Sequence, residues 1–429
     1  MHERFGSLPM EQLLEPVIQL ALAGVRVTEK QEARLAANRQ AFIDVNGPET
    51  FFATPFKAGE MIRYPVLAAT LQTLQQEGRD AFYKGSIGER LVADVQQRGG
   101  ILSMEDLEKY SAVWREPVTF TYGPYRMITM GPPSSGGVTL GQLFGMLSHQ
   151  RLRGLSHNRP DYMQLLVELM RRAYADRATY LGDPDFTEIP VDALLDAGYL
   201  KERAKDIRPG TATSSADVSA GEVYMYEKEE TTHYSIVDAF GNAVSATTTL
   251  NGAYGSKVFV ESLGFFLNNE MDDFSSKPGV PNMFGLIGSE ANEIAPEKRM
   301  LSSMTPTIVE KEGELFMVVG TPGGSTIITA VFQTILNVIQ FDMSMQEAVN
   351  APRFHHQWLP DLINLEPNGF DSVLVKACKS AGIWLMKGTI PSLERWMPSY
   401  AYRMGASREG QIHAVMIAHV AIKGCQRRT

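Results

Sequence analysis

Apolar positions in the first half of the chain recur mainly at helical spacing. This spacing predicts helices over residues 9–23, 65–74 and 162–180, with Asp161 as the N-cap of the third. Two short runs at 117–122 and 125–130 instead favour strands. The first half is therefore expected to be mainly helical.

The second half begins with strand patterns and continues into a strongly apolar helix. Strands are predicted at 307–310 and 315–319, joined by a turn at Glu312-Gly313. Residues 325–340 are apolar nearly all round, so we expect this helix to be buried between layers. Ser344 and Glu347 then form the pattern of a capping box for one more helix.

A polar segment separates the two patterns. Residues 208–230 are rich in Gly, Ser, Thr, Pro and acidic residues, which predicts an exposed linker without regular structure. The chain then favours an extended run at 231–237, a turn at 238–242 and a β-branched run at 243–250, so a hairpin is expected. Thr231 would stand at the leading edge of that hairpin.

Thr231 alone is best explained as one more strand threonine, because β-branched residues fit pleated sheets. Several motifs after it change that interpretation: Thr249-Leu250-Asn251, Leu267-Asn268-Asn269-Glu270-Met271-Asp272-Asp273-Phe274, Leu301-Ser302-Ser303-Met304-Thr305-Pro306, Gly320-Thr321-Pro322-Gly323-Gly324-Ser325 and Asn350-Ala351-Pro352-Arg353-Phe354-His355-His356-Gln357. Their order and spacing resemble the small subunit of the gamma-glutamyltransferase (gamma-glutamyltranspeptidase) family. The first half resembles the large subunit through Arg4-Phe5-Gly6-Ser7-Leu8-Pro9, Pro132-Pro133-Ser134-Ser135-Gly136-Gly137 and Tyr174-Ala175-Asp176-Arg177.

The resemblance, which runs from about residue 4 to about residue 370, implies both a fold and a maturation step. The expected fold is α+β, a four-layer αββα sandwich of the N-terminal-nucleophile hydrolase type. The expected parts are a large-subunit-like half, residues 1–230, and a small-subunit-like half, residues 231–429, made from one precursor. The two halves are expected to interleave in one structural unit.

Self-cleavage would follow from the chemistry of Thr231. Our hypothesis is that its Oγ attacks the carbonyl of Glu230 and that water cleaves the resulting ester. The freed α-amino group has an ordinary pKa of roughly 8, so one residue can supply both nucleophile and general base. His233 is then better interpreted as a structural residue.

The family pattern implies partners for this nucleophile. Thr249 would orient the hydroxyl, and Asn251 would hold the hydroxyl or the substrate. Gly323 and Gly324 precede the buried helix, where backbone N–H groups could stabilise an oxyanion. The alternatives are that Thr249 only completes a strand and that Gly-Gly is only a turn.

A γ-glutamyl substrate carries an α-ammonium and an α-carboxylate. Glu270 and Asp273 resemble the ammonium-binding pair of the family, and Ser302 and Ser303 would donate to the carboxylate. Asp272 fits a structural role equally well. Without the nucleophile, the whole set would be explained as a polar loop.

Three features depart from the family pattern or extend it. The family's large subunit starts upstream with a substrate-binding arginine in a Phe-Arg-Glu context, whereas this chain opens at Met1 and offers no obvious replacement. Residues 392–429 lack the family's usual ending. Residues 277–299 resemble the lid loop, with Phe284 where many bacterial relatives have a tyrosine.

Composition is compatible with this interpretation and excludes some others. The net charge of −9 argues against a nucleic-acid surface, and no apolar run is long enough to span a bilayer. Cys378 and Cys425 are too few for a disulfide framework or a zinc site. No metal or organic cofactor is expected. The start lacks a signal peptide, while bacterial family members are commonly periplasmic or secreted, so localisation stays open.

The function expected is that of a gamma-glutamyltransferase or glutathione hydrolase. Thr231 would take the acyl group from a glutathione-like compound and pass it to water, an amino acid or a peptide. The alternatives are a related acylase, an enzyme that processes poly-γ-glutamate, and an unprocessed, inactive homologue. Retention of Glu270 and Asp273 argues against a glutaryl substrate, which has no α-amino group.

Overall fold

The computed structural model describes residues 1–152, 154–219, 229–277, 279–283, 285–366, 369–370, 376, 399–401 and 416–420. The chain divides into two compact units, one of residues 1–114 and 254–269 and the other of residues 115–253 and 270–429. Both units take residues from each side of the Glu230–Thr231 junction. The expected division into residues 1–230 and 231–429 therefore does not coincide with the two compact units. As a division of the sequence into two halves, it stays a prediction.

The first unit is helical around an aromatic core. Its elements are α1 (His2–Phe5), α2 (Met10–Ala23), β1 (Val25–Arg26), α3 (Glu29–Asn46), η1 (Phe51–Ala53), β2 (Met61–Ile62), α4 (Pro65–Glu77), α5 (Asp80–Tyr83), α6 (Ser86–Gln97), α7 (Met104–Lys109), β7 (Phe259–Val260) and β8 (Phe265–Phe266). Phe42 on α3 contacts the rings of Phe52, Tyr254 and Phe266. The inserted strands β7 and β8 thus complete the core of this unit.

The second unit is built on a six-stranded sheet of order β13-β14-β10-β9-β4-β3. Its strands are β3 (Val118–Tyr122), β4 (Tyr125–Thr129), β9 (Thr307–Lys311), β10 (Glu314–Val319), β13 (Ser399–Ala401) and β14 (Met416–Val420). All pairs are antiparallel except β10 with β14. The predicted strands at 117–122, 125–130, 307–310 and 315–319 are confirmed within a residue or two.

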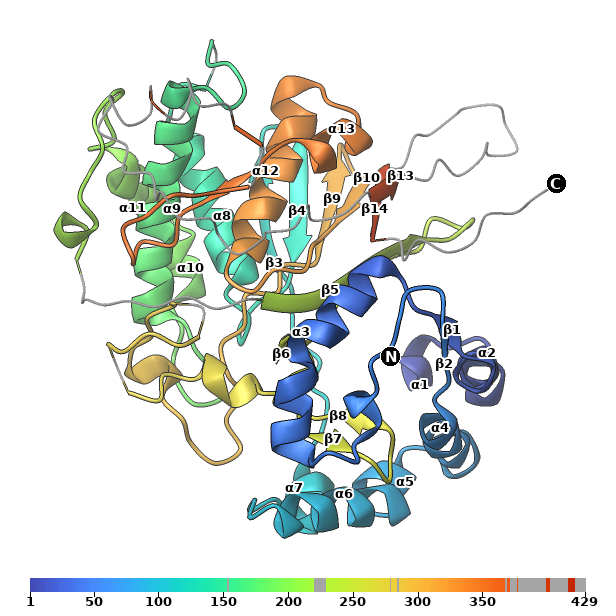
Figure 1. Ribbon diagram of the computed structural model, residues 1–429. Helices are drawn as coiled ribbons and strands as arrows, with labels where there is room; N and C mark the ends of the chain where they lie inside the picture. The colour runs from blue at the N-terminus through green and yellow to red at the C-terminus, as the bar shows by residue number, and fades with distance from the viewer. Residues whose placement is uncertain are drawn as a thin grey trace. The chain divides into compact units, whose positions relative to one another are not determined.

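Helices cover one face of this sheet. They are α8 (Gly136–Leu147), α9 (Pro160–Tyr180) and α12 (Thr326–Phe341), drawn together beside β4 and β9 in Figure 1. Met127, Val309 and Met317 of the sheet share one buried cluster with these helices. The expectation of a buried helix over 325–340 is confirmed, since eleven of its residues are buried.

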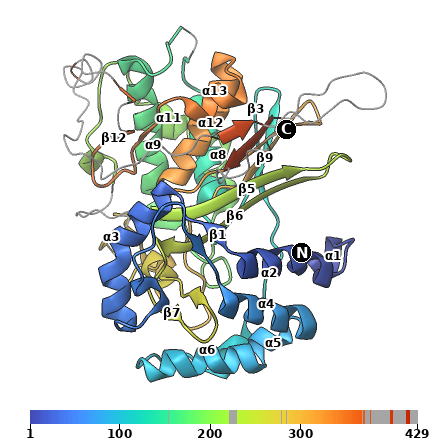
Figure 2. The same cartoon turned by 45° about the vertical axis from the view of Figure 1, so that its right-hand side comes forward.

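A long hairpin covers the other face. Strands β5 (Glu229–Val237) and β6 (Ala243–Gly252) pair antiparallel, as Figure 2 shows. Val237 of β5 packs on Val318 of the sheet, and Ser245 Oγ donates to the Val319 carbonyl at 3.2 Å. The predicted hairpin is confirmed. Helix layer, sheet and hairpin account for three layers of the expected sandwich.

Shorter elements complete the second unit. They are α10 (Val191–Leu194), α11 (Ala197–Ala204), η2 (Ser215–Asp217), η3 (Glu270–Asp273), η4 (Glu290–Asn292), α13 (Met345–Asn350), β11 (Phe354–His355) and β12 (Asn364–Leu365). The capping box of Ser344 and Glu347 is present at the start of α13.

The expected N-cap of the third helix is wrong. Helix α9 begins at Pro160 with Arg159 as the N-cap residue, so Asp161 lies inside the first turn. Proline suits this first position, because its fixed φ matches the helix and its missing N–H would have no partner there. Asp161 still complements the positive end of the helix dipole.

The expectation of an exposed linker over 208–230 holds at most positions of its described part, residues 208–219, but it is wrong at Ser215 and Val218, which are buried. Ser215 is only 1% exposed. The Thr213 N–H donates to Glu168 at 2.9 Å, the Ser215 N–H donates to Asp361 at 2.8 Å, and Trp358 Nε1 donates to the Ser215 carbonyl at 3.1 Å. The small polar residues were expected to face solvent, whereas here backbone N–H groups of the segment pair with the carboxylates of Glu168 and Asp361.

Candidate active site

Thr231 and Thr249 face each other across the hairpin. They are paired in register, and Oγ1 of Thr231 donates to Oγ1 of Thr249 at 3.3 Å. The register shifts between Glu229 and Thr231, so the Glu230–Thr231 bond lies at an irregularity of β5. Bulges of this kind are common beside active sites, where they re-aim a side chain.

Asn251 connects this pair to the acidic residues. Its backbone N–H donates to Thr249 Oγ1 at 2.9 Å and also interacts with the Glu270 carboxylate. Asn251 is buried and has a φ of 70°, a left-handed conformation that asparagine tolerates better than most residues. The left-handed turn at the end of β6 thus brings η3 next to the hairpin.

Glu270 and Asp273 form a partly buried acidic pair on η3. Burial raises the pKa of Glu270 to about 7, against the hydrogen bond from Asn251. Burial also raises the pKa of Asp273 to about 8, helped by the charge of Glu270 and opposed by Arg177. Two neighbouring carboxyl groups with raised pKa values gain from a cationic ligand, which would favour their ionised forms.

The loop over 277–299 lies against this pair. Asn282 Nδ2 donates to Asp273 Oδ1 at 3.3 Å, and the Met283 N–H donates to Asp272 Oδ2 at 3.0 Å. Asp272 therefore ties down the loop, in agreement with the structural role considered for it. Phe284 lies outside the described residues, and the lid function stays a prediction.

Two residues of the large-subunit-like half, Ser135 and Arg177, form hydrogen bonds with Ser302 and Ser303. Ser135 donates through its N–H and its Oγ to the Ser302 carbonyl, at 2.9 and 2.8 Å. Arg177 on α9 donates through Nε to Ser135 Oγ at 2.9 Å and through Nη2 to Ser303 Oγ at 3.2 Å. Arg177 is also the cation that acts on Asp273.

Sequence reasoning missed Arg177 as a site residue. In the sequence, residue 177 appeared only as the last position of the motif Tyr174-Ala175-Asp176-Arg177. One property of its helix could still have indicated its role. Helix α9 buries Glu168, Arg171, Arg172, Asp176 and Arg177 along with its apolar residues. Buried charges need partners, and several on one helix indicate a polar site nearby.

His233 is a packing residue of the hairpin. Its ring nitrogens lie 2.9 Å from the hydroxyl oxygens of Thr247 and Ser235, and the side chain is 1% exposed. A Cβ on Gly320 would lie 2.2 Å from the ring, so only glycine fits there. This geometry supports the structural interpretation of His233.

Gly323 and Gly324 form the turn from β10 into α12. Both have positive φ, 136° and 45°, and their carbonyls accept the first N–H groups of the helix turn. Gly320, at the start of the same loop, packs against His233, which lies on the same side of β5 as Thr231. The loop is thus brought beside the hairpin with its N–H groups at the start of a 16-residue helix.

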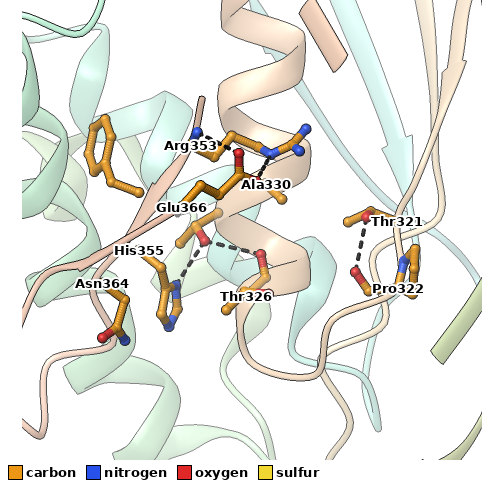
Figure 3. Close-up of a pocket in the computed structure, with 10 residues that line it drawn as sticks. Thr321, Pro322, Thr326, Ala330, Arg353, His355, Asn364 and Glu366 are labelled. Atoms are coloured by element: carbon orange, nitrogen blue, oxygen red, sulfur yellow. Dashed lines mark hydrogen bonds and ion pairs between the residues drawn. The ribbon is translucent and has the colours of Figure 1, made fainter. Parts of the chain in front are cut away.

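A small cavity lies under this loop but contains none of the predicted site residues. Its volume is about 30 Å³, and Thr321, Thr326 and His355 are among its lining residues (Figure 3). His355 Nδ1 lies 2.8 Å from Thr329 Oγ1, and Arg353 pairs with Glu366. The cavity is best explained as a packing space behind the loop.

The described residues contain no group of three His, Cys, Asp or Glu side chains placed to hold a metal ion. In the same part of the chain, no helix is both long and apolar enough to cross a membrane. Cys378 and Cys425 lie outside the described residues.

Comparisons with known proteins agree with this fold. The profile of the family described as Gamma-glutamyltranspeptidase matches residues 1–392. The glutathione hydrolase proenzyme of Escherichia coli K12 is 40% identical over 384 residues, which are 89% of this chain and 66% of that protein. The glutathione hydrolase proenzyme of Pseudomonas aeruginosa is 46% identical over 363 residues, 84% of this chain and 64% of that protein.

The crystal structure of cephalosporin acylase from Bacillus halodurans has a TM-score of 0.73 at 24% identity and covers 90% of this chain and 69% of that one. The fold is of the N-terminal-nucleophile hydrolase type, so the predicted fold class is confirmed. More narrowly, the chain belongs to the gamma-glutamyltranspeptidase family. It spans slightly less than two thirds of the length of the two glutathione hydrolase proenzymes, 66% and 64%.

Proposed function

We propose that the chain cleaves itself at Glu230–Thr231 and then transfers or hydrolyses γ-glutamyl groups through Thr231. One observation carries this proposal: the predicted residues lie along a continuous series of contacts within one unit. The series runs from Thr231 through Thr249, Asn251, Glu270 and Asp273 to Arg177 and Ser303. These contacts bring together residues that are as many as 126 positions apart in the sequence.

Self-cleavage would begin at Thr231 Oγ. The oxygen attacks the Glu230 carbonyl, the C–N bond breaks, and the nitrogen takes the proton that the hydroxyl loses. Water then hydrolyses the ester, leaving a carboxylate on Glu230 and a free α-amino group on Thr231. Thr249 supports the step by accepting the hydrogen bond that orients the attacking hydroxyl.

Turnover would use the same hydroxyl with its new neighbouring amine as general base. The α-ammonium of the substrate binds between Glu270 and Asp273, while the carboxylate takes donors from Ser302 and Ser303. The N–H groups of Gly323 and Gly324 stabilise the oxyanion as the amine product leaves. An acyl-enzyme remains, and water or an amino acid accepts the γ-glutamyl group.

The acidic pair favours this substrate over that of a glutaryl acylase. A glutaryl group has no α-amino group and would leave two partly buried carboxyls without a cationic ligand. A γ-glutamyl group supplies that cation. The pair therefore selects for an amino-acid end.

The test is to purify the 429-residue chain, follow it on a denaturing gel and sequence any small fragment. A fragment that begins Thr-Thr-His-Tyr is expected, together with release of the amine from a γ-glutamyl anilide. Thr231→Ala should abolish both, and Thr231→Ser should retain both. Thr232→Ala is the matched control, because Thr232 is exposed on the opposite side of the same strand.

Two outcomes contradict the proposal. An uncut wild-type chain that releases no amine would identify an unprocessed, inactive homologue. Cleavage of the Thr231→Ala chain at the same bond would show that another group performs the scission.

A further inference from the structure

Arg177 places a permanent positive charge inside the wall of the candidate site. It lies near the end of α9, and only 4% of the residue is exposed. Its guanidinium donates to the hydroxyl oxygens of Ser135 and Ser303, and it interacts with Asp273 through charge alone. Burying a guanidinium whose hydrogen bonds go mainly to neutral hydroxyls costs free energy, unless a nearby anion offsets its charge.

The contact with Ser303 fixes what that hydroxyl can do. A serine hydroxyl has one hydrogen to donate and two lone pairs that accept. Because Oγ of Ser303 accepts from Arg177, its own hydrogen points away from the guanidinium. Donation from a charged group also polarises the hydroxyl and strengthens the bond that it donates in turn.

Ser135 connects Arg177 to Ser302 through hydrogen bonds. Its Oγ accepts from Arg177 and donates to the Ser302 carbonyl at 2.8 Å. The Ser302 N–H donates to the Pro133 carbonyl at 3.0 Å, so the Ser302 backbone is held on both sides. Arg177 thus fixes both serines of the pair, one directly and one through Ser135.

The two predicted substrate-binding parts of the site, the acidic pair and the serine pair, have opposite electrostatic character. Glu270 and Asp273 are acidic, whereas Ser302 and Ser303 have Arg177 behind them. An α-amino acid group has the complementary arrangement, an ammonium and a carboxylate on one carbon. Ligands that lack either group match only one end.

We propose that Arg177 is a positioning residue for the α-carboxylate: it aims the Ser303 hydroxyl, fixes Ser302 and supplies the positive potential behind both. This inference rests on the proposed γ-glutamyl function and identifies Arg177 as a source of positive charge for carboxylate binding. Arg177 reaches the ligand through the serines and is not assigned a contact with it.

The test compares two ligands that differ only in the α-carboxylate. Binding of L-glutamate and of 4-aminobutyrate is measured by titration calorimetry on the full chain, for wild type, Arg177→Met and Arg177→Lys. Arg177→Met is expected to weaken glutamate binding by about tenfold or more and 4-aminobutyrate binding by less than about twofold, since only glutamate loses a charge-assisted donor. Arg177→Lys keeps the charge but not the two-donor geometry, so an intermediate loss on glutamate alone is expected.

Arg172→Met provides a matched control. Arg172 is on the same helix, equally buried, and paired with Glu168 and Asp206 rather than with the serines. It should lower the thermal unfolding midpoint without changing the ratio of the two affinities. If Arg177→Met does not fold, Arg177→Lys alone decides the question through the same ratio.

Three results would overturn the inference: equal losses for the two ligands in the Arg177 variants, wild-type affinity for glutamate in those variants, or no glutamate binding by the wild-type chain. The proposed function is judged separately, by the Thr-Thr-His-Tyr fragment and by amine release. A chain that cleaves itself and releases amine, but keeps its ligand ratio in Arg177→Lys, would retain the function and lose the inference.

Discussion

Binding of an α-ammonium should weaken steeply when the pH falls below about 7. Burial raises the pKa of Glu270 to about 7 and that of Asp273 to about 8, so both carboxyls begin to take up protons within the neutral range. A protonated carboxyl attracts a cation far less than a carboxylate. Each proton that must leave before the ligand binds therefore makes affinity depend on pH.

The size of the effect follows from these pKa values. Between pH 6 and pH 8, the ionised fraction of a group with a pKa of about 7 rises about tenfold, and that of a group with a pKa of about 8 rises roughly fiftyfold. Because the two groups interact, their protons belong to the pair. We expect about a tenfold gain in glutamate affinity if one proton leaves, and several hundredfold if both leave.

Calorimetry between pH 6 and pH 8, in buffers of different ionisation enthalpy, measures affinity and the number of protons released together. Glu270→Gln is the informative variant, because it removes one titrating group and also the like charge that raises the pKa of Asp273. The proton count should fall and the rise in affinity should shift to lower pH. Constant affinity across this range, or binding without proton release, would refute the reasoning.

Three further predictions concern single contacts. Thr249→Val removes the acceptor for Thr231 Oγ, so the fragment should appear on a denaturing gel roughly three- to tenfold more slowly, as the loss of a neutral hydrogen bond implies; an unchanged rate would remove Thr249 from the mechanism. Gly320→Ala puts a Cβ against the His233 ring and should destabilise the chain by about 1–3 kcal/mol in denaturant unfolding, whereas wild-type stability would show that the ring moves easily. Glu168→Leu deprives the two arginines beside it on α9 of a buried carboxylate, so a loss of about 3 kcal/mol is expected, and a stable variant would mean that their other acidic partners suffice.

Local sequence signals predicted the elements that carry Thr231, the proposed nucleophile, and the glycine loop. The hairpin of β5 and β6 followed from β-branched runs on either side of a turn, and α12 from an apolar surface nearly all round. These signals are short-range, since each strand pairs with its neighbour in sequence. Thr231 and Thr249 are cross-strand partners for the same reason.

Contacts between distant segments could not be predicted in this way. Arg177 and Ser303 are 126 positions apart and meet only because α9 and the segment before β9 pack in one unit. The segment around Ser215 looked like a linker because its composition is polar, yet its backbone has charged partners in Glu168, which is buried on α9, and in Asp361. The composition of a segment predicts only its average exposure. It does not predict which of its groups pair with a charged side chain elsewhere in the chain.

The position of the junction explains how one chain could become two without losing its fold. Strand β4 comes before Glu230 and strand β9 after it, and they pair over five residues in the middle of the six-stranded sheet. Ser215, also before the junction, binds Asp361 and Trp358 after it. Scission at Glu230–Thr231 would therefore break one bond at the edge of the hairpin and leave the shared sheet, the helix layer and these anchors in place. The irregular start of β5 is the one part of this arrangement whose pairing the cut would change, and it is also the part that must open for Thr231 to present a free amine.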